Sequence, residues 1–159
     1  MNPWGAVAGG FVGTLVLTTG LRAASELRLT RMDLPFLLGT AFSGNRVRAK
    51  AVGDVLHFVA GQAFAFIYYG VFAAIDESGV LLGAAFGLLH ALFSGTALVN
   101  VLLPVVHPRM GSTHTAADST PLLEPPGFMM RNYGRATPVA NIVVHVLYGA
   151  IVGGFVSLG

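Results

Sequence analysis

Residues 78–108, SGVLLGAAFGLLHALFSGTALVNVLLPVVHP, contain no Asp, Glu, Lys or Arg. An α-helix needs about 20 apolar residues to cross roughly 30 Å of hydrocarbon. The stretch is longer than that, and we expect its span to end near Pro104, because proline kinks or ends a helix. It therefore predicts a transmembrane helix, and the rest of the chain follows the same pattern.

Three further uncharged stretches, residues 1–21, 55–75 and 136–159, each have the length of one span. The first lacks the basic start of a signal peptide, so we expect it to be retained as a helix. Of all 159 residues 54% are hydrophobic and only 10% are charged, against about a quarter in soluble domains. The sequence thus predicts an all-α polytopic membrane protein with four transmembrane helices in a single domain, residues 1–159.

Positive charge gathers in two long loops, residues 22–54 and 109–135, whereas the short turn after the second span carries Asp76 and Glu77. Because cytoplasmic loops are rich in Lys and Arg, we expect both long loops in the cytoplasm and both termini outside. The basic loops are also suited to contact anionic lipid headgroups. The basic residues are Arg22, Arg28, Arg31, Arg46, Arg48, Lys50, Arg109, Arg131 and Arg135.

The first loop contains a candidate short helix within residues 32–44. Asp33 is suited to cap its start, and Pro35 fits its first turn. An apolar helix between basic flanks lies in the interface plane or re-enters the bilayer. An ordinary loop anchored by apolar residues is the alternative. The second loop, with three prolines between positions 121 and 126, is expected to be irregular.

Self-comparison indicates an internal duplication. Matches recur at an offset of 78 residues in the first part of each half and of 88 in the second, with the difference in the second loop. We expect two parallel helical hairpins, about 1–77 and 78–159, related by a pseudo-twofold axis along the membrane normal. Chance matching among 21 glycines is the alternative. The matched positions are Gly5-Ala6 with Gly83-Ala84, Gly9 with Gly87, Arg31-Met32 with Arg109-Met110, Gly39 with Gly127, His57 with His145, and Gly61 with Gly149.

Small residues recur at every fourth position of the spans, as in Gly5, Gly9 and Gly13. This spacing lets helix backbones approach closely in lipid. It serves packing within one chain or between subunits equally well. We expect a homo-oligomer through one glycine face, or a subunit of a membrane complex.

Histidines inside the spans are the first candidates for a site, since ionisable residues there are costly and indicate function. His57 and His145 each begin a His-x-x-x-Gly pattern, so each shares a face with a small residue. By the repeat they should face each other, whereas His90 has no counterpart. Asp54 and Asn141 each lie one turn before a histidine and could hold its tautomer.

Other polar residues extend this candidate site. Arg22 and Glu26 continue a stripe that Thr14 and Thr18 begin at helical spacing, and His107 near the cytoplasmic exit of the third span could join the site. The chain has no Cys, which excludes disulfides, thiolate metal sites and Cys nucleophiles. No pattern typical of a soluble enzyme or of nucleic-acid binding is present, so we lean against an enzyme.

Three interpretations remain open. In the first, the protein is channel- or transporter-like, and the histidines with Arg22 and Glu26 line a proton or solute path. In the second, the histidines are interhelical hydrogen-bond partners in a structural or accessory subunit of a membrane complex. In the third they bind haem, or a divalent metal, as paired ligands. Candidate ligands are His57, His145, His90 and His107.

Four segments together resemble a known group of proteins: residues 31–39, RMDLPFLLG, residues 56–58, LHF, residues 87–90, GLLH, and residues 145–149, HVLYG. They are similar to uncharacterised small bacterial membrane proteins with four helices, classed as a domain of unknown function. The resemblance implies a place in the bacterial cytoplasmic (inner) membrane. It implies no activity and no site residues.

Overall fold

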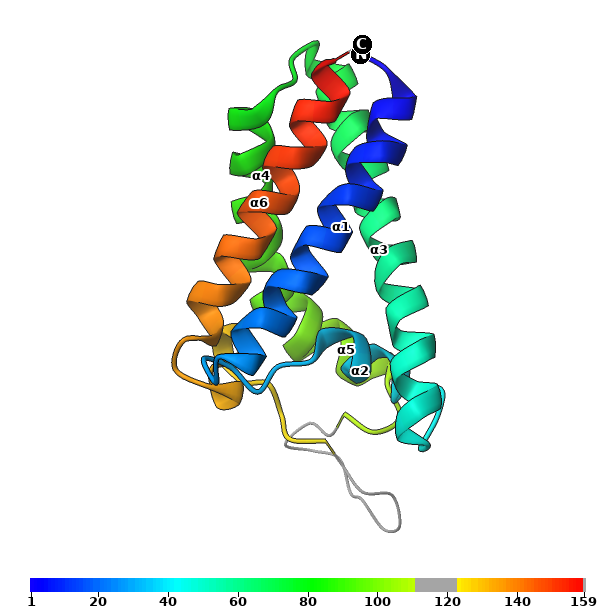
Figure 1. The fold of residues 1–159 in the computed structure, drawn as a ribbon, viewed down its shortest axis with the longest axis vertical. Coiled ribbons are helices and arrows are strands. Elements are labelled where there is room, and N and C mark those ends of the chain that lie inside the picture. Colours follow the sequence, from blue (N-terminus) through cyan, green and yellow to red (C-terminus); the bar gives the residue numbers. More distant parts are fainter. Residues whose placement is uncertain (111–122, 159) are drawn as a thin grey trace.

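A computed structural model describes residues 1–110 and 123–158. Residues 111–122, which hold much of the loop expected to be irregular and its extra length, lie outside the described residues. The described part is helical, with one isolated β-bridge between Met110 and Leu123. Four of its helices are long and apolar enough to cross a membrane (Figure 1). The all-α fold and the predicted number of spans are therefore confirmed.

The spans are built from six segments. The first span is α1 (Pro3–Glu26), the second is α3 (Arg46–Ile75) and the fourth is α6 (Thr137–Ser157). The third span joins α4 (Val80–Phe93), a π-helix η1 (Ser94–Leu102) and α5 (Leu103–Val106). Two short helices lie in the loops, namely α2 (Leu34–Gly39) and the 3-10 helix η2 (Phe128–Tyr133).

The helices extend further into the charged loops than the uncharged stretches predicted. Because α1 continues to Glu26 and α3 begins at Arg46, the first loop is shorter than residues 22–54. At 1.5 Å per residue the 30 residues of α3 span about 45 Å, so its charged first turns extend beyond the hydrocarbon. The third span ends at Val106, two residues past Pro104 and so near the predicted end, with Pro104 at the junction of η1 and α5.

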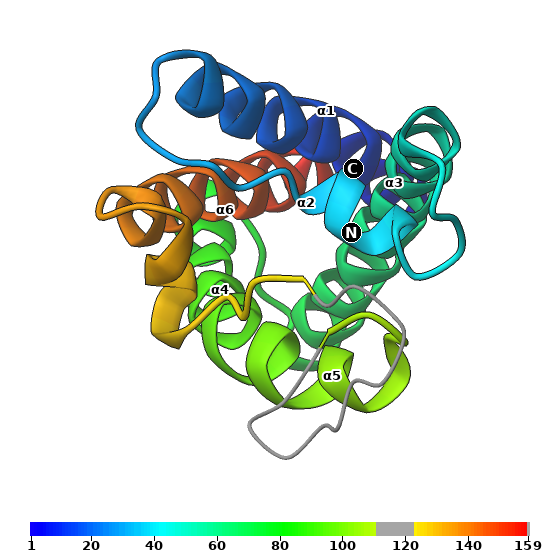
Figure 2. The ribbon, with the colours of Figure 1, turned by 90° about the horizontal axis from the view of Figure 1, so that it is seen from below.

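The short helix of the first loop forms as predicted. Asp33 caps it, with its side chain accepting a hydrogen bond from the Phe36 N–H at 2.9 Å, and Pro35 lies in the first turn. Figures 1 and 2 place α2 beneath the bundle, between the loop-side ends of α1 and α3.

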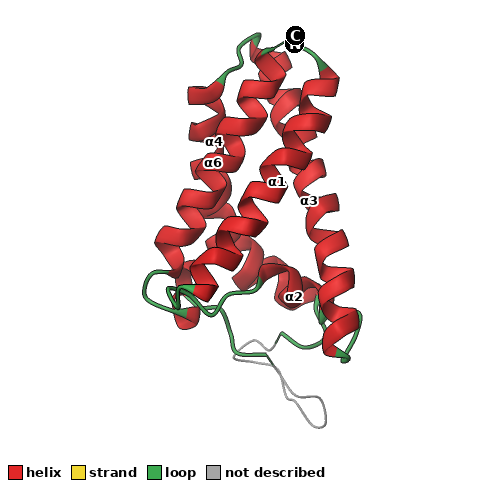
Figure 3. Ribbon diagram, viewed as in Figure 1, coloured by secondary structure: helices red, strands yellow, loops and turns green. Residues whose placement is uncertain are grey.

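Both termini and the turn between α3 and α4 lie at one end of the bundle, and the described parts of the two long loops lie at the other (Figures 1 and 3). This arrangement agrees with the predicted grouping of the loops on one side. Which side faces the cytoplasm remains a prediction.

Helix α6 lies between α1 and α4 (Figure 2) and contacts both through glycine. A Cβ added to Gly149 would lie 2.7 Å from the backbone nitrogen of Gly87, and one added to Gly9 would lie 3.0 Å from the Cα of Val152. Such close approach is the packing that small residues permit in lipid. These glycine faces pack within one chain, so they offer no free face for the expected homo-oligomer, which stays a prediction.

Helices α3 and α4 meet through aromatic side chains instead. The ring of Phe86 lies 5.5 Å from that of Tyr68 and 5.2 Å from that of Phe72, both edge-on. Tilted and edge-on rings at these distances are the favourable arrangement for aromatic pairs. The bulky contact holds α3 and α4 further apart than the glycine contacts hold α6 to its neighbours.

The outer surface of the spans carries large apolar side chains, among them Trp4, Val59, Leu81 and Leu89, all exposed. A soluble monomer rarely exposes a contiguous apolar surface of this extent. Four spans with such a surface are typical of a multi-pass membrane protein.

Candidate functional site

A cavity of about 150 Å³, here called the histidine cavity, lies among the transmembrane helices. His57 of α3, His90 of α4 and His145 of α6 all line it. Leu34 and Leu38 of α2 also contribute to its wall. The other lining residues are Thr14, Leu17, Ala60, Gly61, Phe64, Ser94, Leu98 and Tyr148, so no formal charge faces the cavity.

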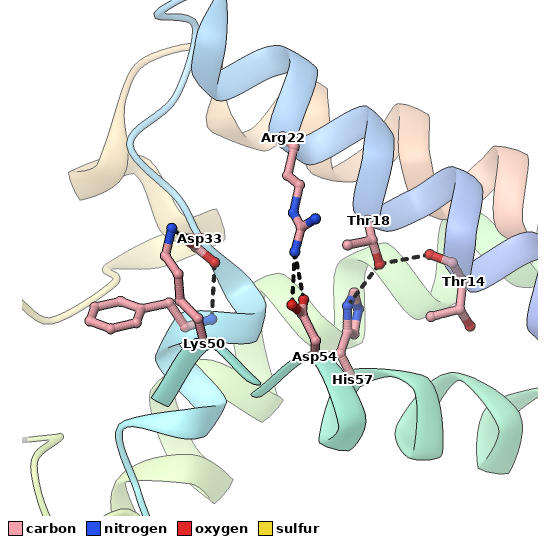
Figure 4. A network of polar contacts seen from close by, with 8 residues as sticks. Thr14, Thr18, Arg22, Asp33, Lys50, Asp54 and His57 are labelled. Atoms are coloured by element: carbon pink, nitrogen blue, oxygen red, sulfur yellow. Dashed lines mark hydrogen bonds and ion pairs between the residues drawn. The ribbon is translucent and has the colours of Figure 1, made fainter. Parts of the chain in front are cut away.

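His57 is held by the polar stripe of α1 (Figure 4). Its Nδ1 lies 3.1 Å from the hydroxyl oxygen of Thr18, and that hydroxyl donates to the Thr14 carbonyl at 2.7 Å. A hydroxyl has one proton to donate, so the Thr18 oxygen accepts the N–H of His57 Nδ1. Neutral His57 therefore carries its proton on Nδ1 and leaves Nε2 as an acceptor.

His145 is held in the same tautomer by its own helix. Its Nδ1 lies 2.8 Å from the Asn141 carbonyl oxygen, which can only accept. Its Nε2 lies 3.5 Å from the hydroxyl of Ser94, which donates to the Ala91 carbonyl at 3.1 Å. Asn141 thus orients His145, as predicted, but through its backbone, while its side-chain amide donates to Ala91 on α4 at 2.9 Å.

The two histidines in direct contact are His90 and His145, with ring centroids 4.7 Å apart and planes at 73°. The contact of His90 with His145 was not predicted, and the facing of His57 and His145 across the cavity that both line stays a prediction. The ring of His90, which has no counterpart in the repeat, also stacks on that of Phe64 of α3 with centroids 3.8 Å apart. His57 lines the same cavity from α3.

The expectation that Asp54 holds the tautomer of His57 is wrong. Its carboxylate accepts from the Arg22 guanidinium at 2.7 and 2.9 Å, across the gap between α1 and α3 (Figure 4). An opposite charge within reach stabilises the carboxylate more than a neutral imidazole would. The polar stripe of α1 therefore contacts two residues of α3, because Thr18 contacts His57 and Arg22 contacts Asp54.

A second cavity of about 500 Å³, here called the basic-end pocket, adjoins the first at the loop end. Leu34 lines both cavities, and Thr18, which lines the basic-end pocket, is the hydrogen-bond partner of His57. The basic-end pocket also contains Glu26, the end of the predicted stripe. The remaining lining residues are Leu21, Arg22, Ser25, Arg31, Met32, Asp33, Pro35, Phe36, Arg46 and Lys50.

His107 lies outside the histidine cavity and does not join His57. Its Nε2 donates to the Leu37 carbonyl at 3.0 Å, and its Nδ1 accepts from the Arg109 N–H at 3.1 Å. Both nitrogens are satisfied by backbone groups, so His107 fastens α2 to the end of the third span.

Tyr133 is the last residue of η2, in the second loop. Burial, with the negative charge of Glu124, raises the pKa of Tyr133 to about 12. The phenol is therefore neutral and donates to the Glu124 carbonyl at 2.8 Å.

Sequence reasoning missed the π-helix η1 and the lining role of Ser94. Thr96 donates to the Leu92 carbonyl at 2.5 Å and Asn100 to the Gly95 carbonyl at 3.2 Å, so side chains satisfy backbone groups in this segment. The small and polar residues within positions 94–100 were the signal in the sequence that could have indicated this segment. Such a segment is of interest because π-helical turns are frequent at functional sites.

Haem and metal ligation gain no support from this geometry. A cavity of about 150 Å³ is smaller than the roughly 300–1,000 Å³ that pockets for drug-sized ligands occupy, and haem is larger than those ligands. Within residues 1–110 and 123–158, no three His, Asp or Glu side chains group closely enough to hold a metal ion.

The ion pair of Arg22 and Asp54 is expected to add little stability, because the two side chains are 63% and 38% exposed. Asp54→Asn should lower the free energy of unfolding by less than about 1 kcal/mol. A double-mutant cycle with Arg22→Gln, unfolded in mixed micelles, measures the coupling. A coupling energy above about 2 kcal/mol would show that lipid shields the pair from water.

The fold and these cavities define a multi-pass membrane protein that encloses three histidines between its helices. Comparison with protein-family models, curated proteins and solved structures gave no match to this chain. The resemblance to small bacterial four-helix membrane proteins therefore gains no support, and the functional argument rests on the site itself.

Proposed function

We propose that this protein is a small transporter-like membrane protein whose solute or proton site is the histidine cavity. One observation carries the proposal: His57, His90 and His145, from three different helices, line one cavity within the spans. Ionisable residues at this depth in a membrane are costly to bury, so their presence indicates a ligand site or an ion path.

Access from the loop end supports the proposal. Leu34 lies between the histidine cavity and the polar basic-end pocket, which a solute reaches first. Towards the other end the core is buried and apolar, with Phe72, Val152 and Val156 fully covered. A central site that adjoins one side and is closed to the other is what alternating access requires.

The proposed orientation places the loop end in the cytoplasm, with the membrane being a bacterial inner membrane. It rests on the excess of Lys and Arg at that end and on Asp76 and Glu77 at the other. Anionic headgroups are the proposed lipid partners of the basic loops.

The proposed duplication is supported by a reciprocal contact between the halves. Arg31 donates to the Asn132 carbonyl at 2.7 Å, and its repeat partner Arg109 donates to the Thr40 carbonyl at 2.7 Å. Each arginine of the repeated Arg-Met pair thus contacts the loop of the other half. The packing is less symmetric, because α6 has two glycine neighbours and α3 meets α4 through aromatic rings.

The test is flux in proteoliposomes that hold a pH-sensitive dye, with uptake of small labelled solutes measured in parallel. We expect protein-dependent flux of a proton or solute, and its loss in the double variant His57→Ala, His145→Ala. Gly70→Ala is the matched control, since a methyl group there meets no atom within 4 Å. A correctly folded parent protein that moves neither protons nor solutes contradicts the proposal.

A structural or accessory subunit is the second candidate, favoured by the interhelical hydrogen bonds. The contact of His57 with Thr18 joins α3 to α1, and that of Asn141 with Ala91 joins α6 to α4. Such bonds are worth on average about 0.6 kcal/mol in membrane proteins. This candidate predicts that the double histidine variant is less stable by about 1 kcal/mol and that the parent shows no flux.

A further inference from the structure

We infer that the histidine cavity takes a small neutral molecule that donates at least two hydrogen bonds, such as urea or acetamide. The inference rests on the proposed function and adds a ligand class to it. It draws on three properties of the cavity: charge, hydrogen-bonding pattern and volume.

The wall of the cavity excludes ions as preferred ligands. None of its lining residues is Asp, Glu, Lys or Arg. Arg22, one turn from Thr18, and Asp54, one turn from the cavity residue His57, pair with each other. An ion in the cavity would lose its hydration without gaining an opposite charge, which is far more costly than burying a neutral polar group.

The tautomers define what the ligand must supply. The N–H groups of His57 and His145 at Nδ1 are bound to Thr18 and to the Asn141 carbonyl, so each Nε2 is left as an acceptor. Within the described residues the hydroxyl of Tyr68 has His90 Nδ1, at 3.3 Å, as its partner. A buried hydroxyl donates where it can, so His90 carries its proton on Nε2. The three rings therefore offer two acceptors and one donor.

The volume limits the ligand to a few non-hydrogen atoms. An apolar cavity of about 150 Å³ holds a molecule of the size of benzene. Urea and acetamide are smaller than that. Each has at least two N–H groups for the acceptors of His57 and His145, and a carbonyl oxygen for the N–H of His90.

The first experiment measures binding without transport, by ¹⁵N NMR of histidine-labelled protein in nanodiscs. We expect His57 and His145 to be protonated at Nδ1, and both Nε2 resonances to shift on titration with urea. N,N-dimethylacetamide, which has the carbonyl but no N–H, should cause no such shift. Protonation of Nε2 in both residues, or equal shifts with both probes, overturns the inference.

The second experiment measures uptake of ¹⁴C-urea into proteoliposomes. Unlabelled acetamide should compete, and N,N-dimethylacetamide should not. His57→Phe removes an acceptor and should lower uptake about tenfold. Thr18→Val removes only the hydroxyl that holds the proton of His57 on Nδ1, so it should lower uptake less. Gly70→Ala is the control for reconstitution.

The outcomes separate this inference from the proposed function. If urea and acetamide neither bind nor cross, but protons or formate cross in a manner that depends on His57, the ligand class is wrong and the transporter-like function stands. If no probe and no proton crosses, both fail. Uptake of urea that His57→Phe leaves unchanged overturns the inference as well.

Discussion

Gly149→Ala is expected to lower the free energy of unfolding by about 3 kcal/mol, the upper end of the usual cost of overpacking. The added methyl group would lie 2.7 Å from the nitrogen and 2.8 Å from the Cα of Gly87, and closer still to the Gly83 carbonyl oxygen. These are backbone atoms of α4, which cannot turn aside as a side chain can. The two helices must separate, and they then lose contact along the glycine seam, which is formed by Gly83 and Gly87 of α4 and by Gly149 and Gly153 of α6.

The measurement is equilibrium unfolding in mixed micelles, with Gly70→Ala as the matched control. Gly70 lies on α3 with open space around its Cα, so alanine there should be neutral or stabilise by up to about 1 kcal/mol through helix propensity. Equal stability of the two variants would contradict the close contact of α4 and α6.

The glycine seam also shows how far the sequence predicts this fold. Glycine at every fourth position predicted close helix contacts, and Gly83 and Gly149 make them. The pattern could not tell which helices meet, because small-residue faces are alike. The contacts of α6 with two neighbours depend on the shape of the whole bundle.

Sequence reasoning selected the three histidines that line the cavity but did not predict the contact of His90 with His145. His57, His90 and His145 were selected because histidine is rare within spans, and all three line one cavity. The contact of His90 with His145 joins α4 to α6 and that of His90 with Phe64 joins α4 to α3, and no local spacing predicts such contacts between helices. The same holds for Asp54, since Arg22 lies 32 residues away in sequence.

Helix α2 illustrates a further limit. Its cap at Asp33 was readable from four residues, because capping is local. Its role in the wall of the histidine cavity depends on a contact with α3, where Gly39 and Gly53 bring the two backbones together. A match of Gly39 to Gly127 in the repeat gave no hint of this contact, and Gly127 instead packs beside Asn132.

Gly53→Ala is expected to displace α2 from α3 and to open the histidine cavity towards the basic-end pocket. A Cβ on Gly53 would overlap the Pro35 carbonyl and lie 3.1 Å from the nitrogen of Gly39, so backbone must move. Leu34 and Leu38, which line the cavity, would move with α2. If the displacement costs the usual 1–3 kcal/mol of overpacking, exposure of these positions rises between about 5- and 150-fold.

A single cysteine reports this opening cleanly, because the chain contains none. Leu38→Cys should react with a membrane-impermeant thiol reagent faster in Gly53→Ala than in the control Gly70→Ala, both on α3. Val152→Cys, fully buried at the far end, should stay unreactive in both backgrounds and thereby exclude general unfolding. If Leu38→Cys reacts at the same rate in both, the contact of Gly39 with Gly53 does not hold α2 against the cavity. Because the reagent reaches the cysteine from the loop end, a faster reaction also identifies α2 as the barrier between the two cavities.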